Sequence, residues 1–219
     1  MMCRCIPLLL LPFLSVPAPS QTQHRPAARP APHAFEDAQL YRNTNFGFRY
    51  RIPYGWVDRT KEMRAQDAEP SDTPAPENGK SARKKESSGD AQGEVLLAVF
   101  ERPPEAIGET INSAVVIAAE SAAAYPGLKK AEDYLGPLTE LTTAKGFKPA
   151  GDPDIIAIDE RELVRADFTK PLNDKLTMRQ STLILLTKGQ IVSFTFIAGS
   201  EEDIDNLINE LHFGSTKTH

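Results

Sequence analysis

The clearest alternation of hydrophobic and polar positions lies near the C-terminus. It predicts a strand over residues 175–187, a turn at Lys188-Gly189, a second strand over residues 190–198 and a helix over residues 200–211. One face of the second strand carries two phenylalanines, which need a cover. The helix supplies that cover, because its apolar residues recur at i, i+3, i+4 and i+7.

Several earlier segments also have strand patterns. Residues 46–52 alternate strictly, which is typical of a half-buried strand, and residues 94–101 hold an uninterrupted apolar run, which is typical of a central strand. Residues 112–119 suit either a strand or a helix, and their β-branched side chains favour a strand. Residues 155–158 and 162–169 indicate a further hairpin.

A second helix is expected over residues 128–145. Apolar side chains at helical spacing form one face of it, and Gly146 closes it. Gly136-Pro137 in the middle predicts a kink or a restart. Together these elements predict an α+β fold with a central, mainly antiparallel sheet of about six strands and two main helices.

The first twenty residues have the pattern of a signal peptide. Arg4 precedes a short apolar stretch, and small residues stand before a cut ahead of Gln21. The apolar stretch is shorter than the roughly 20 residues that a membrane-spanning helix needs. Both cysteines, Cys3 and Cys5, lie in this segment, so the mature chain is expected to have no disulfide and no thiolate metal site.

The rest of the chain divides by composition. Residues 21–37 are rich in proline and are expected to form a flexible leader. Residues 38–213 are expected to form a single domain, and residues 214–219 a tail. Residues 61–93 are rich in Pro, Ser, Glu, Lys and Asp, and they predict a long disordered insertion in that domain.

Charge and motifs exclude several classes of function. The net charge of −5 argues against a nucleic-acid binder, which needs a basic face. The sequence has no glycine-rich phosphate loop and no G-x-S-x-G, H-E-x-x-H or C-x-x-C motif. Of four histidines, two lie in the leader, one is the last residue, and His212 is expected at the end of the last helix. We therefore expect no histidine-based catalytic or zinc site.

Charged residues offer two candidate sites. Asp152 and Asp154 could give oxygen ligands to Ca²⁺ or Mn²⁺, although a turn is the preferred interpretation. Arg165, Asp167, Arg179 and Gln180 fall on adjacent predicted strands. They could form a buried polar site, or they could pair across the strands on a partly solvated face, which is preferred.

Two aromatic residues follow the first predicted strand. Tyr54 and Trp56, the sole tryptophan, stand in a turn and are candidate binding residues. Trp56 could anchor a partner, but a plug at the end of the core is the favoured interpretation.

Two stretches carry a resemblance to a known family. Residues 46–56 (FGFRYRIPYGW), residues 188–196 (KGQIVSFTF) and the acidic-capped helix that follows resemble the PsbP-like superfamily of PsbP, DcrB and Ran-binding Mog proteins. The resemblance covers residues 38–213 and is carried by apolar and turn residues. It implies an α/β/α sandwich around an antiparallel sheet. It also implies members that bind proteins or act as accessory subunits, without a shared catalytic apparatus.

The sequence therefore predicts an exported domain, periplasmic or secreted, that is not an enzyme. Its expected role is protein binding or that of an accessory subunit, with another envelope or secreted protein as partner and with no cofactor. The alternative is a module that binds a small ligand or a divalent metal, through the sheet face or through Asp152 and Asp154. A hydrolase built on a carboxylate pair is a third hypothesis.

Overall fold

The structure is a computed structural model that describes residues 39–68, 93–106 and 108–214. These residues belong to one unit, Ala34–His219. The expected signal peptide, the leader and the tail from residue 215 lie outside the described residues, as do residues 69–92 of the expected insertion. In the described part of the chain, no helix is long and apolar enough to cross a membrane.

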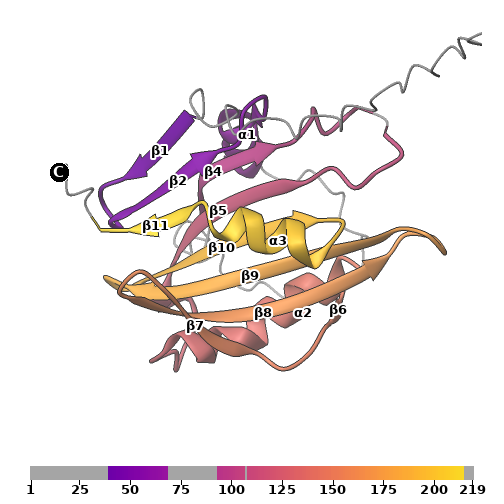
Figure 1. Cartoon of the computed structure of the whole chain (residues 1–219). Helices are drawn as coiled ribbons and strands as arrows, with labels where there is room; N and C mark the ends of the chain where they lie inside the picture. The colour runs from indigo at the N-terminus through magenta and orange to yellow at the C-terminus, as the bar shows by residue number, and fades with distance from the viewer. Residues whose placement is uncertain (1–38, 69–92, 107, 215–219) are drawn as a thin grey trace, which may run out of the picture. The chain divides into compact units, whose positions relative to one another are not determined.

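Two antiparallel sheets build the fold (Figure 1). The larger sheet has the strand order β3-β4-β5-β10-β9-β8-β6, and β7 also pairs with β8. Its strands are β3 (Val57–Asp58), β4 (Glu94–Phe100), β5 (Ala114–Ser121), β6 (Lys148–Pro149), β7 (Asp154–Ile158), β8 (Arg161–Pro171), β9 (Thr177–Thr187) and β10 (Gln190–Ala198). The smaller sheet, in the order β1-β2-β11, comprises β1 (Gln39–Asn43), β2 (Phe48–Ile52) and β11 (Leu211–Phe213). The α+β class with antiparallel sheets is confirmed, whereas the expected six strands are too few.

Within the described residues, three α-helices accompany the sheets, instead of the two expected: α1 (Thr60–Ala68), α2 (Leu135–Ala144) and α3 (Glu201–Ile208). The helix expected over residues 128–145 is a 3₁₀ turn, Ala131–Tyr134, followed by α2. Gly136-Pro137 thus lies in the first turn of α2, where a proline costs no helical hydrogen bond, so it marks a start and not a kink.

The last helix is shorter than expected. It ends at Ile208, and the following residues pair with β2 as strand β11, with Leu211 opposite Tyr50. His212 therefore lies in a strand and not at a helix end, and its Nδ1 is 3.8 Å from Asp159 Oδ2. The sequence pattern failed here because a three-residue strand is too short to show a period.

Helix α1 seals the open edge of the larger sheet beyond the short strand β3. Thr60 Oγ1 accepts the Ala98 N–H at 2.9 Å, and Arg59 N–H donates to the Ala98 carbonyl at 2.8 Å. Arg64 donates to the backbone carbonyls of Val95 and Leu96. The insertion expected to be disordered from residue 61 is therefore helical at its start, because these groups satisfy the unpaired backbone of an edge strand.

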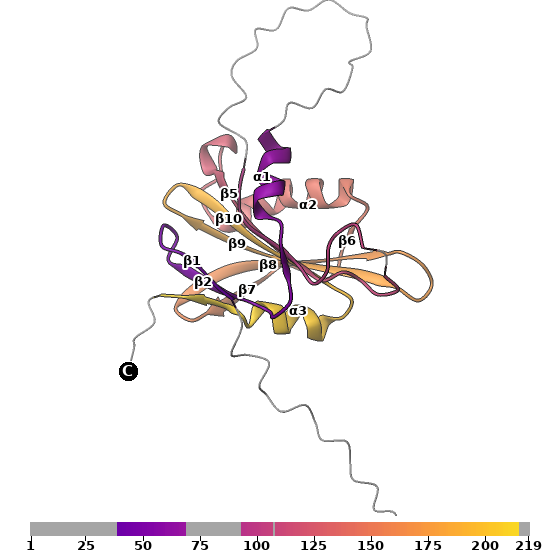
Figure 2. The same cartoon turned by 90° about the horizontal axis from the view of Figure 1, so that it is seen from above.

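Two hydrophobic clusters lie on opposite faces of the larger sheet. One lies between this sheet, the smaller sheet and α3, and its fully buried aromatics are Tyr50, Phe194 and Phe196. The other lies under α2 and the 3₁₀ turn and includes Tyr134 and Phe168. Figure 2 shows α3 and the smaller sheet on one side of the larger sheet and α2 on the other.

The turn between β9 and β10 confirms the predicted hairpin. Lys188 and Gly189 both have positive φ angles, +51° and +71°. A two-residue turn of this kind matches the right-handed twist of the strands that it joins. It sets the register in which Thr187 faces Gln190 and Phe196 faces Ser181.

A carboxylate ties the chain between β5 and α2 to the sheet. Glu120 on β5 accepts hydrogen bonds from the hydroxyls of Tyr125 and Tyr134, the latter at 2.8 Å. The two tyrosine rings meet edge to face at 5.1 Å between centroids. Burial, together with the hydrogen bond to Glu120, raises the pKa of Tyr134 and that of Tyr125.

Ser200 caps α3, since its Oγ accepts the Asp203 N–H at 3.1 Å. Replacing it with alanine leaves that N–H without its partner. We expect Ser200→Ala to lower the free energy of unfolding by about 1 kcal/mol in urea denaturation. Ser121→Ala is the matched control, because Ser121 stands at the cap of a 3₁₀ turn without a side-chain cap bond. Equal effects at the two serines would contradict the capping role.

Stability is expected to fall steeply above pH 10. Burial raises the pKa of Tyr50, as it does those of Tyr125 and Tyr134. Above the ordinary value of 10.0 the unfolded chain releases these protons before the folded chain does. Tyr50 and Tyr134, which are both fully buried, then each lower the free energy of unfolding by up to about 1.4 kcal/mol per pH unit.

The measurement is urea denaturation between pH 9 and pH 11 on the wild type and on Tyr134→Phe. The variant should show a shallower decline. Tyr54→Phe, at a side chain that is 71% exposed, is the control. An unchanged slope in Tyr134→Phe would contradict the expectation.

Candidate functional site

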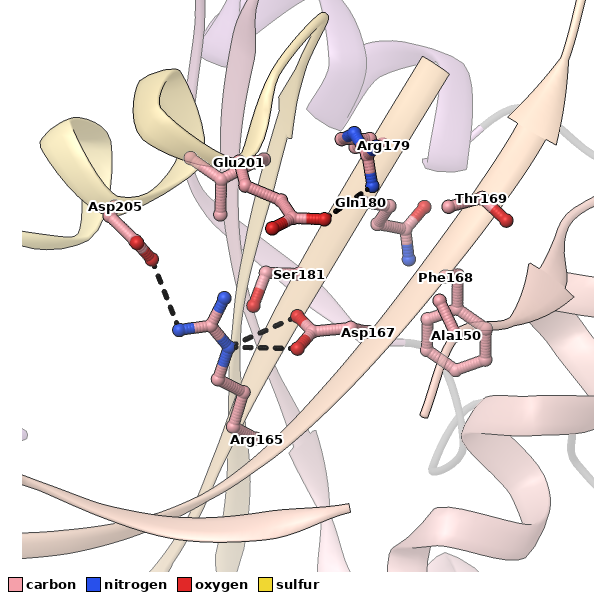
Figure 3. A pocket seen from close by; sticks show the side chains of 11 residues that line it. Ala150, Arg165, Asp167, Phe168, Thr169, Arg179, Gln180, Ser181, Glu201 and Asp205 are labelled. Atoms are coloured by element: carbon pink, nitrogen blue, oxygen red, sulfur yellow. Dashed lines mark hydrogen bonds and ion pairs between the residues drawn. The ribbon is translucent and has the colours of Figure 1, made fainter. Parts of the chain in front are cut away.

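A charged pocket lies where α3 crosses β8 and β9 (Figure 3). Its volume is about 230 Å³. The lining residues come from the segment after β6, from β8, from β9 and from α3: Ala150, Arg165, Asp167, Phe168, Thr169, Arg179, Gln180, Ser181, Glu201, Ile204 and Asp205.

The two strands place their side chains here by alternation. Arg165 and Asp167 are two residues apart on β8 and so share a face of the sheet. Arg179 and Ser181 do the same on β9, and the register sets Asp167 opposite Ser181. Gln180 falls between them, and its amide hydrogen-bonds to Thr182 at 3.2 Å.

Helix α3 adds two carboxylates from above the same face. Glu201 and Asp205 are four residues apart, which puts them on one side of the helix. The apolar side of α3 holds it against the sheet, since Ile204, Leu207 and Ile208 are buried. The pocket is therefore built by the packing of the helix and not by a loop.

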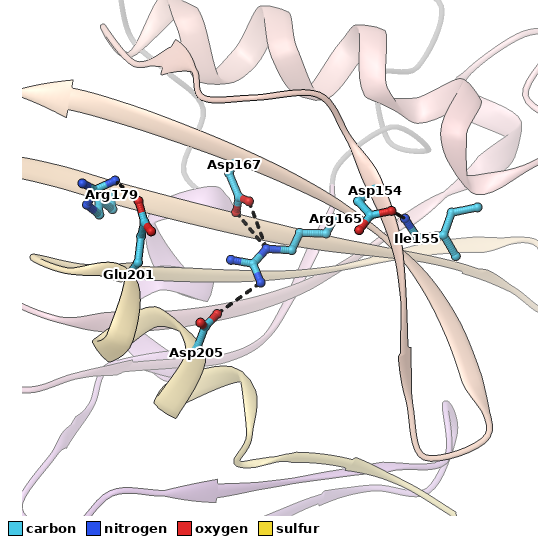
Figure 4. A network of polar contacts seen from close by, with 7 residues as sticks. All are labelled: Asp154, Ile155, Arg165, Asp167, Arg179, Glu201 and Asp205. Carbon is cyan, nitrogen blue, oxygen red and sulfur yellow. Dashed lines mark hydrogen bonds and ion pairs between the residues drawn. The ribbon is translucent and has the colours of Figure 1, made fainter.

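Arg165 is the centre of the polar network (Figure 4). Its Nε donates to both carboxylate oxygens of Asp167, at 3.1 and 3.0 Å. Its Nη1 donates to Asp205 Oδ1 at 3.1 Å, which joins β8 to α3. Burial opposes the charge of the guanidinium, but Asp167 and Asp205 outweigh it, and the pKa of Arg165 is raised.

Arg179 makes a second link between the sheet and the helix. Its Nη1 lies 2.8 Å from Glu201 Oε1. The Glu201 side chain is 77% exposed, so water screens this pair more than it screens Arg165 and Asp167, at 24% and 38%. The network thus has an inner part that is held firmly and an outer part that is held loosely.

Ser181 differs from its neighbours in the pocket. It is 1% exposed, and its Oγ has no hydrogen-bond partner in the described part of the chain. A buried hydroxyl without a partner loses its hydration with no compensation, at a cost of about 1–3 kcal/mol. Such a group calls for an explanation.

The sequence-predicted residues Arg165, Asp167 and Arg179 come together in this pocket. Their expected cross-strand pairing is wrong, because Arg165 pairs with Asp167 on its own strand and with Asp205 on α3. Arg179 pairs with Glu201 on α3. The helix offers carboxylates above the sheet plane, and the long arginine side chains reach them.

The other candidates lie apart from the pocket lining. Trp56 is half-buried and packs on the core cluster of the smaller sheet, whereas the neighbouring Tyr54 is exposed. Asp152 and Asp154 are both exposed, and Asp154 Oδ1 accepts the Ile155 N–H at 2.7 Å. Among the described residues, no three His, Cys, Asp or Glu side chains are grouped to hold a metal ion.

Sequence reasoning missed Ser181, Glu201 and Asp205 as pocket residues. The spacing of Glu201 and Asp205 was a usable signal, because acidic residues four apart beside the apolar stripe of a helix face the same way.

Known proteins resemble this chain in structure only. Neither the scan against protein-family models nor the search of curated proteins finds a match. Among solved structures, cyanobacterial PsbP (CyanoP) from Synechocystis sp. PCC 6803 is similar at a TM-score of 0.44 and 12% identity. That match covers 80% of this chain and 91% of that one.

Two further structures are similar to the same degree. The Saccharomyces cerevisiae Ran-binding protein Mog1p has a TM-score of 0.42 and 9% identity, with 82% of this chain and 97% of that one covered. LpqN, involved in cell envelope biogenesis of Mycobacterium tuberculosis, has a TM-score of 0.42 and 14% identity, with 81% and 90% covered. A PsbP protein and a Mog protein are thus among the structures that this chain is similar to.

The two arginines of the pocket should differ in their contribution to stability. Arg165→Met keeps an apolar stem but removes the charge that Asp167 and Asp205 share. We expect it to lower the free energy of unfolding by about 1 kcal/mol in urea denaturation. Arg179→Met, which loses one pair with an exposed partner, should cost at most about 0.5 kcal/mol. A larger loss in Arg179→Met would contradict this order.

Proposed function

We propose that this chain is an exported, non-enzymatic binding or accessory domain that contacts a partner protein through the charged pocket. The observation that carries the proposal is the division of the pocket into a fixed inner pair and exchangeable outer carboxylates. Export rests on the signal-peptide pattern of residues 1–20.

The outer carboxylates are suited to exchange. Glu201 and Asp205 are 77% and 59% exposed, and exposed ion pairs contribute only about 0–1 kcal/mol. Charged groups of a partner can therefore draw them away from Arg179 and Arg165 at small cost. The inner pair of Arg165 and Asp167 stays in place and offers a preorganised surface, which lowers the cost of binding.

The central group of the pocket favours binding over proton transfer. The raised pKa of Arg165 keeps its guanidinium charged at all physiological pH values. A general acid or base works best with a pKa near the operating pH, which this group does not have. Arg165 can orient a charged partner, which is the task of electrostatic complementarity at an interface.

A ligand-binding module is the second candidate function. It is favoured by the pocket itself, which combines converging polar groups with an apolar residue, Ile204. The metal version would use Asp152 and Asp154, which need further ligands beyond these two carboxylates.

Affinity capture from an envelope extract tests the proposed function. The mature chain, tagged at its C-terminus, is compared with Arg179→Glu, which reverses a charge at the pocket rim. We expect the wild type to recover a protein that Arg179→Glu loses. Lys129→Glu, at an exposed residue outside the pocket lining, is the matched control and should recover that protein in full.

Circular dichroism first establishes that both variants are folded. Two results would count against the proposal: no protein recovered by the wild type, or equal recovery by Arg179→Glu.

A further inference from the structure

The pocket has spare capacity to accept hydrogen bonds. Ser181 Oγ, buried and without a partner, lies opposite Asp167 in the strand register. Figure 3 shows the Ser181 side chain among those of Arg165, Asp167 and Glu201. Each carboxylate oxygen has two lone pairs, and among the side chains of the described residues the oxygens of Asp167 accept only from the Nε of Arg165. A ligand that donates several hydrogen bonds would satisfy these acceptors together.

The charge of the pocket favours a cation. Two guanidinium groups face three carboxylates, so the lining carries one more negative charge than positive. An anion would have to displace Asp205 or Glu201 from its arginine. A cation needs no such displacement, because it uses lone pairs that the carboxylates still have.

We infer, on the basis of the proposed function, that the pocket binds a primary ammonium group held by Ser181, Asp167 and Glu201. An ammonium has three N–H donors and no acceptor. These donors match the three acceptors, which are the hydroxyl of Ser181 and the carboxylates of Asp167 and Glu201. Ile204, which also lines the pocket, offers apolar contact to the methylene groups behind the ammonium.

A divalent metal fits this lining less well. Ca²⁺ needs oxygens at about 2.3–2.6 Å from its centre, whereas N–H donors reach acceptors at about 2.7–3.2 Å. In the part of the chain that the structure describes, no three acidic, His or Cys side chains are close enough for a metal. The two carboxylates and one hydroxyl of the proposed site therefore suit an ammonium, which needs three acceptors, better than a divalent metal.

Titration with n-butylammonium chloride, followed by amide NMR shifts of the mature chain, tests the inference. We expect saturable shifts at Ser181, Asp167 and the first turn of α3. 1-Butanol, which lacks the charge, and butyrate, which reverses it, should give none there. Sodium chloride at equal ionic strength corrects for screening.

Three variants separate binding from folding. Glu201→Gln should weaken butylammonium binding about two- to fivefold, the range of an exposed ion pair. Glu202→Gln, in the same helical turn but outside the lining, should leave binding unchanged. Ser181→Ala should weaken binding about tenfold, since a hydrogen bond to a charged group is lost. Its Tm should not fall, because it removes a buried hydroxyl without a partner.

A lysine-containing tripeptide distinguishes the source of the ammonium. Tighter binding of the peptide than of butylammonium assigns the site to a lysine of a partner, and equal binding assigns it to a free amine. Shifts with butyrate alone, no saturable shift with butylammonium, or full binding by Ser181→Ala would overturn the inference. The affinity capture is independent of this titration, so a partner lost in Arg179→Glu would keep the proposed function even if no amine binds.

Discussion

The fold depends on covering one face of β10. In an isolated hairpin, this face and its two phenylalanines, Phe194 and Phe196, would have no cover. In the protein both side chains are fully buried. Their cover comes from two directions, since Phe48 and Phe213 of the smaller sheet meet Phe194 while α3 closes the rest. Tyr50 locks the two covers together, because its hydroxyl donates to the Leu207 carbonyl at 3.2 Å. The smaller sheet and α3 are thus parts of one hydrophobic cover, although β1 and β11 lie at opposite ends of the described chain.

The pocket arises where this cover stops. Along β8 the face changes from buried Leu163 to charged Arg165, and along β9 it changes from buried Leu183 to Ser181. The helix continues over the boundary with its apolar side inward, so its first turn projects beyond the hydrophobic cluster. The acidic side chains at this end of the helix then face polar and charged strand residues. The pocket therefore exists because α3 extends past the edge of the hydrophobic cluster.

Period and turn chemistry predicted the features that are local in the sequence. The hairpin at Lys188-Gly189 was legible because its turn uses two adjacent residues between two alternating strands. Helix α1 was missed because its own composition is polar, and it gains its stability from the contacts of Thr60 and Arg64 with β4. Strand β11 was missed because it is short and its partner β2 is distant in the chain.

The candidate site shows the same limit. The sequence placed Arg165, Asp167 and Arg179 on adjacent strands, and these residues do line one pocket. That Glu201 and Asp205 are the partners of these arginines could be learned only from the packing of α3. The sequence of a helix does not say which strands the helix will cover. The missing partner of Ser181 is a property of the assembled pocket alone, since the sequence offers hydroxyls and acceptors in abundance.

Helix α1 has a consequence for how the protein behaves among other proteins. Without it, β4 would present a long apolar strand with unpaired carbonyl and amide groups from Val95 to Ala98. Such an edge is a template for intermolecular β-pairing and amyloid-like growth. Thr60 and Arg64 hydrogen-bond to these backbone groups and so block the pairing of β4 with a strand of another molecule. A polar helix that contributes little to the core thereby protects the protein from aggregation.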